Sequence, residues 1–183
     1  MIRILSVLLL LPLFAACQSP TDPDDTIDID DFLEFSSTPN PAIATAATDG
    51  RTYRVVRGNN QPDDILPFDW YTTFAVTATL NSKADDKDAL EFPVDVTSVT
   101  IAVKQASGGI VTAPTGGETE HFHYVTSATT NRYATASSSV TVAFEVWYDL
   151  PSLKREALIT VTFAFRDDDG ATFSKSFDVR VAP

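Results

Sequence analysis

Apolar and polar residues alternate with a period of two along most of the chain downstream of residue 51. The clearest runs span residues 68–80, 99–103, 140–148, 159–165 and 177–181. These runs are rich in Val, Thr, Ile and Phe, and such alternation is typical of strands that bury one face. No segment beyond the first 16 residues shows a convincing helical period. The pattern therefore predicts an all-β domain.

Turn residues separate the alternating runs, and the last turn, Asp167–Gly170, predicts a hairpin loop with Gly170 at positive φ. The apolar phase slips between Val96 and Val99, which predicts a β-bulge at Thr97-Ser98. About seven to nine antiparallel strands, each with one buried face, favour a two-sheet sandwich. A closed β-barrel is the alternative.

The amino terminus has a different pattern. Arg3 supplies one positive charge, residues 4–14 are apolar except for Ser6 and Pro12, and Ala15-Ala16 follow. A basic start, a short apolar core and small residues at the end are typical of a secretory signal. The apolar run is shorter than the roughly 20 residues that a transmembrane helix needs. We expect residues 1–16 to be a signal peptide.

Cys17 is the only cysteine in the chain, and it follows this signal directly. The segment from Leu13 to Cys17 resembles a bacterial lipobox, with Phe14 where Leu is usual. The resemblance implies a diacylglycerol thioether and an N-acyl chain on Cys17. Several acyl chains, at about 0.8 kcal/mol per buried methylene, make a stable anchor. The alternative is an ordinary secretory signal followed by a free thiol.

The residue directly after Cys17 is a glutamine, and it resembles the residue at this position in lipoproteins that diderm bacteria sort to the outer membrane. We therefore expect a lipid anchor in the outer membrane, with the protein on its periplasmic or its surface side. Residues 17–50 are interpreted as an acidic, Pro-rich tether, in which residues 27–35 could form a short strand or helix on the domain. The sandwich is expected at 51–183.

The formal net charge of −12 argues against nucleic-acid binding, because phosphate contacts need clustered Lys and Arg. It also argues against electrostatic docking on anionic lipid. A single cysteine permits no internal disulfide, so packing must stabilise the fold.

Residues 159–181, two Thr/Val-rich runs joined by Asp167–Gly170, resemble the last two strands of bacterial Ig-like domains of the PKD and cadherin-like kind. The tryptophan- and glycine-rich signature of PKD domains is absent. The resemblance implies an Ig-like sandwich and carries no functional residue with it.

His121 and His123 share a face if they lie on one strand, and they could form half of a zinc site. The alternative is two histidines on a solvated face. Carboxylate runs at 22–31, 85–88 and 167–169 could bind calcium, although the Gly and Glu of an EF-type loop are missing. Solvated turns and tether are the alternative there.

Tyr71 and Trp147 face outward if their apolar neighbours face inward. An outward Tyr or Trp on a sheet can bind glycan by stacking or form a protein hot spot. The alternative is that a loop, or the segment around Phe32-Leu33, covers both rings.

These observations favour a non-enzymatic binding or structural module with no cofactor beyond its lipid. Its partner would be an envelope protein or a glycan, and it could be a subunit of an envelope complex. The alternatives are a glycan- or calcium-dependent adhesion module and a metal-assisted hydrolase using His121 and His123.

Overall fold

A computed structural model describes most of the chain downstream of residue 28. The described ranges are 29–47, 51–55, 64–66, 68–85, 90–105, 110–111, 122–128, 130–149 and 156–183. The expected signal peptide, Cys17 and His121 lie outside these ranges, so the structure does not bear on them.

One sheet contains the alternating run at 68–80 in its centre. Its order is β1 (Leu33–Thr38), β6 (Trp70–Leu80), β11 (Ser139–Tyr148) and β9 (Phe122–Ala128), and all pairs are antiparallel. Strand β3 (Thr45–Ala46) pairs with the start of β6. We call this sheet A.

The second sheet, sheet B, is built on the long strand β7 (Val94–Gln105). Its order is β10 (Arg132–Tyr133), β7, β12 (Ala157–Arg166), β13 (Thr172–Ala182) and β2 (Ala42–Ile43), with β8 (Ile110–Val111) also on β7. Strand β2 runs parallel to β13. A separate hairpin joins β4 (Tyr53–Val55) to β5 (Asp64–Leu66), and two 3₁₀ turns span Ile29–Asp31 and Ser82–Asp85.

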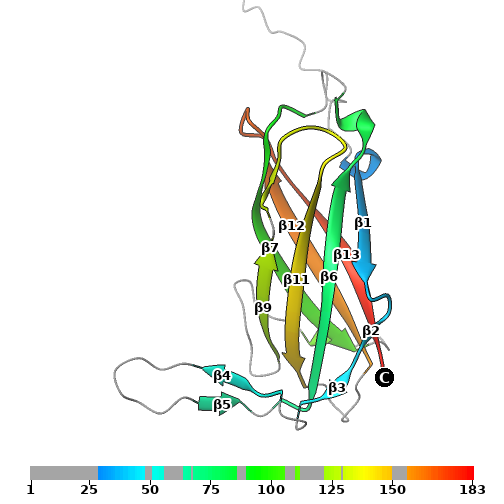
Figure 1. The fold of residues 1–183 in the computed structure, drawn as a ribbon, viewed down its shortest axis with the longest axis vertical. Helices are drawn as coiled ribbons and strands as arrows, with labels where there is room; N and C mark the ends of the chain where they lie inside the picture. The colour runs from blue at the N-terminus through cyan, green and yellow to red at the C-terminus, as the bar shows by residue number, and fades with distance from the viewer. Residues whose placement is uncertain are drawn as a thin grey trace, which may run out of the picture.

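The two sheets pack face to face as two layers (Figure 1). Their strand order, β1-β6-β11-β9 facing β7-β12-β13, is that of ABED facing CFG in a constant-type immunoglobulin sandwich. Seven strands in the described part have six or more residues. The predicted all-β, two-sheet architecture is confirmed.

Alternation places one face of each long strand in the core. Phe144 of β11 stacks on Phe74 of β6 with ring centroids 5.0 Å apart, and Phe163 and Phe165 of β12 belong to the same buried core from the side of sheet B. Every second residue of 140–148 and of 159–165 is buried, as the pattern predicted. These aromatic rings fill the space between the sheets.

Two local predictions are also confirmed. Val96 pairs with Phe165 while Ser98 pairs with Ala164, so Thr97 is the extra residue of a β-bulge. Gly170 has a φ of 90° in the turn between β12 and β13.

The sandwich begins upstream of residue 51, within the segment that we interpreted as tether. Strand β1 pairs with β6 from Leu33 to Thr38, and Leu33 is buried. The Phe35 ring lies 5.4 Å from Phe163 and 5.5 Å from Phe177, which are both in sheet B. The short alternating stretch thus supplies an edge strand, because its apolar residues complete the core.

Candidate functional site

Three aromatic side chains form a row across the outer face of sheet A. Trp147 of β11 pairs with Tyr71 of β6 on one side and with His123 of β9 on the other. Directly paired residues of neighbouring strands share a face. Since Tyr148 and Phe122, the next pair along, lie in the core, this row points away from it.

A segment inserted between β3 and β6 covers this row. Ala47, Phe68, Tyr71 and Trp147 form a second buried cluster, separate from the main core, against which Tyr53 of β4 packs. We call these residues and His123 the aromatic cluster. It lies at the end of the sandwich from which the β4–β5 hairpin projects (Figure 1).

Ring contacts join the hairpin to the sheet. The Tyr53 ring stacks on the His123 ring with centroids 4.4 Å apart and an interplanar angle of 16°. It also meets Trp147 edge-on at 5.1 Å. Phe68 contacts His123 edge-on at 5.4 Å. Aromatic pairs at such distances contribute about 0.5–1.5 kcal/mol each beyond the area that they bury.

Arg51 makes two polar contacts with the aromatic cluster. Its carbonyl oxygen accepts a hydrogen bond of 3.1 Å from the Trp147 indole Nε1. Its guanidinium lies 4.9 Å above the centre of the Tyr71 ring, in cation–π geometry. Burial raises the pKa of Tyr71, and Glu145 adds to the increase, while the charge of Arg51 opposes it.

Tyr71 and Trp147 are therefore not an open platform. Each side chain is only 7% exposed. The alternative that other residues cover them is what the structure has, although the cover comes from Ala47, Tyr53 and Phe68 rather than from the segment around Phe32-Leu33. A row of rings on the outer face would leave a contiguous apolar patch, and the chain buries it with its own insertion.

The prediction for Phe68 was wrong. The alternating run 68–80 placed its side chain with Phe74 in the main core, yet Phe68 packs in the aromatic cluster. Strand β6 begins at Trp70, so Phe68 precedes the strand and its side chain does not follow the strand's period of two.

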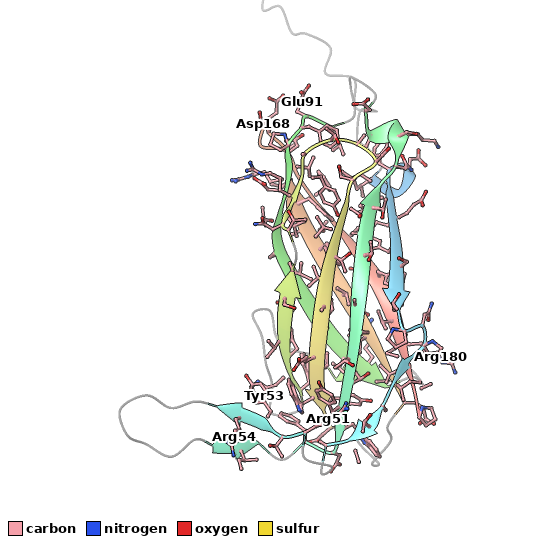
Figure 2. The ribbon with its side chains drawn as sticks, in the orientation of Figure 1. Arg51, Tyr53, Arg54, Glu91, Asp168 and Arg180 are labelled. Carbon is pink, nitrogen blue, oxygen red and sulfur yellow. The ribbon has the colours of Figure 1, made fainter. Side chains whose placement is uncertain are left out.

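The β4–β5 hairpin extends sideways beyond the aromatic cluster (Figure 1). Figure 2 shows Arg51, Tyr53 and Arg54 together at this end of the molecule. Ile65 of β5 is 56% exposed, and Arg54, its partner on β4, is also exposed. A two-stranded hairpin is marginal by itself in water, so the packing of Tyr53 stabilises its base. Sequence reasoning missed this element, because only the short run Tyr53–Val55 indicated a strand.

The two histidines and the carboxylates give no metal centre in the described part of the chain. No group of three or more His, Cys, Asp or Glu side chains there could hold a metal ion. His123 stacks in the aromatic cluster, while His121 is outside the described residues, so the zinc site stays a prediction. The Asp167 carboxylate accepts a hydrogen bond of 2.7 Å from the Ala171 N–H, which supports the turn alternative for residues 167–169.

Comparison with protein-family models and with curated proteins finds no match for this sequence. Among the helices in the described ranges, none has the length and apolar character to cross a bilayer.

Proposed function

We propose that this protein is an envelope lipoprotein, anchored through Cys17, whose sandwich is a non-enzymatic binding module that presents the β4–β5 hairpin to a partner protein. The observation that carries the proposal is the placement of this hairpin relative to the start of the domain. With this placement, one end of the sandwich would face the membrane and the other end would face a partner.

The first described residues, Ile29–Asp31, lie at the end of the sandwich opposite to the carboxyl terminus and the hairpin (Figure 1). Residues 18–28 connect this end to Cys17. A lipid on Cys17 would therefore keep the end with the Asp167–Gly170 turn nearer to the membrane. The hairpin then lies at the far end, where it is accessible to another envelope protein.

The side chains of the hairpin suit a protein partner. Arg54 of the hairpin, and Arg51 just before it, are exposed cations in a chain with a formal net charge of −12. Ile65 adds an exposed apolar side chain beside Arg54. Arg and large apolar residues are typical of the energetic centres of protein interfaces. We expect the partner to offer an acidic surface with an apolar recess.

The test is photo-crosslinking of the full-length protein in intact cells. A photoreactive amino acid replaces Ile65 in one strain and Ser174, an exposed residue of β13, in a control strain. We expect one crosslinked protein from position 65 and none from position 174. An identical set of crosslinks from both positions, or none from either, would contradict the proposal. Arg54→Glu should reduce the crosslink from position 65, since it reverses the charge that the acidic partner meets.

A further inference from the structure

A groove opens between the two sheets on the side where β9 is the edge of sheet A. It has a volume of about 140 Å³. Its walls come from three strands and the loop before β10, and the lining residues are Val96, Ser98, Val99, Thr126, Ala128, Thr130, Asn131, Val140 and Val142. The groove thus reaches the apolar interior of the sandwich from the surface. It does not involve the aromatic cluster or the hairpin.

Strand edges flank the groove. On the free side of β7, strand β10 pairs with residues 94–95 and β8 pairs with residues 103–104. Between them, residues 97–102 have no strand partner on that side within the described part of the chain. The outer side of β9 is likewise without a strand partner among the described residues. Such edges present backbone N–H and C=O groups to which an extended peptide can add.

The floor of the groove is apolar. Val140 and Val142 of β11 and Val96 of β7 are all buried. Ala128 of β9 pairs with Val142 and shares its inward face, while Ser127 pairs with Ala143 on the outer face. Small side chains at the rim leave room over this floor for an apolar side chain of an added strand.

One end of the groove carries charge. Val96, Thr130 and Asn131 also line an adjoining polar hollow of about 580 Å³, together with Asp95, Thr97, Arg132 and Arg166. Arg132 donates to both carboxylate oxygens of Asp95, at 2.6 and 3.1 Å, and the charge of Asp168 also acts on Arg132.

Arg166 is exposed, and among the described residues its charge acts on Asp95 without a hydrogen bond or an ion pair from its side chain. Because Arg132 holds both carboxylate oxygens of Asp95, the hydrogen-bond donors of the Arg166 guanidinium can bind the carboxylate of a ligand. A cation beside an apolar floor favours an anionic ligand with an apolar part.

We propose that this groove binds an extended peptide segment of a partner protein, added as a strand between β7 and β9. One apolar side chain of the peptide lies over Val140 and Val142, and one carboxylate binds Arg166. Backbone hydrogen bonds to the strand edges supply affinity, while the apolar floor and Arg166 supply selectivity. This proposal is independent of the hairpin.

The probe is a display library of random ten-residue peptides, selected on the lipidated full chain in detergent micelles. We expect enrichment of peptides in which apolar residues alternate with polar ones and which carry an Asp, a Glu or a free carboxyl terminus. Ala128→Trp fills the groove, and Ser127→Trp places the same ring on the other face of β9 as the control. Arg166→Gln removes the cation, and Arg180→Gln, at an exposed position of β13, is its control.

Selected peptides should bind Ala128→Trp and Arg166→Gln at least tenfold more weakly than the wild type, and both controls as tightly. Thermal unfolding of each variant checks that its fold is intact. Selection of no such peptide, or equal binding to Ala128→Trp, would show that the groove is closed by the chain itself or is not a site. A wild-type dimer that Ala128→Trp dissociates, seen by sedimentation, would make a second copy the occupant and overturn the proposal.

Discussion

At the scale of single residues, Tyr133 shows how a polar group can join the two sheets. It lies on β10 in sheet B and is fully buried, and its hydroxyl donates a hydrogen bond of 3.0 Å to the Ala78 carbonyl oxygen in sheet A. Burial raises the pKa of Tyr133 from its ordinary value of 10.0. The phenol therefore stays protonated in the fold at a pH at which the unfolded chain ionises.

Tyr133→Phe should lower the free energy of unfolding by about 1 kcal/mol at pH 7, because it removes one buried hydrogen bond. Above pH 10 the unfolded wild-type chain loses the Tyr133 proton first, so the stability of the wild type falls as the pH rises through that range. The variant lacks this contribution and should lose less stability there. Urea unfolding at pH 7 and at pH 10.5 measures both effects, and an equal loss in the two proteins would contradict the pKa argument.

Trp147 contributes to stability because other residues of the aromatic cluster cover its ring. Trp147→Ala should lower the free energy of unfolding by about 3–5 kcal/mol, since the ring is buried against Tyr53 and Tyr71. Val125→Ala, on the neighbouring strand at a residue 48% exposed, is the control and should change it little. Denaturant unfolding compares the two. A small effect at Trp147 would mean that its ring is open to solvent.

At the scale of elements, the β12–β13 hairpin depends on its turn. The Asp167 carbonyl oxygen accepts a hydrogen bond of 3.1 Å from the Gly170 N–H, and the Asp167 N–H donates to the Ala171 carbonyl oxygen. A Cβ at Gly170 would have no atom within 4 Å. Steric crowding therefore does not require glycine at this position, whereas its positive φ favours it.

Gly170→Ala should cost about 1–2 kcal/mol of unfolding free energy, which is the backbone cost of a left-handed conformation for a residue with a Cβ. Gly170→Asn should cost less, because asparagine tolerates this region better. The midpoint of thermal unfolding measures both variants. Equal midpoints for wild type and Gly170→Ala would mean that the turn changes conformation in the variant.

At the scale of the whole molecule, Ile29–Asp31, the first described residues, and the β4–β5 hairpin lie at opposite ends of the sandwich (Figure 1). The end with Ile29–Asp31 carries Glu91 and Asp168, and the hairpin end carries Arg51 and Arg54 (Figure 2). Acidic groups near the anchored end would be repelled by anionic headgroups, so attachment should depend on the lipid rather than on charge.

Cys17→Ser should therefore abolish incorporation of labelled palmitate and move the protein from the membrane fraction to the soluble fraction. Ser19→Ala, two residues later, is the control and should keep both the label and the membrane fraction. Protease treatment of intact cells that carry the wild-type protein then reports whether the domain lies on the cell surface. A Cys17→Ser protein that stays with the membrane would contradict anchoring by lipid.

The strands were predictable because alternation is local. Val140, Val142, Phe144 and Val146 are buried as their spacing predicted, and Thr97 is the bulge that the phase slip indicated. The candidate sites were harder to predict. Tyr71 and Trp147 have the outward placement that the pattern predicted, but covering them requires residues far away in sequence, such as Tyr53.

The sequence by itself determined which residues form the long strands and which of their faces are apolar, because side-chain direction in a strand depends only on position along it. It also determined the turn at Gly170. Only the tertiary structure decided which outward faces stay open, that β1 belongs to the sandwich, and that a groove remains between β7 and β9. Those features depend on which strands become neighbours, and the pairing of distant segments leaves no local pattern in the chain.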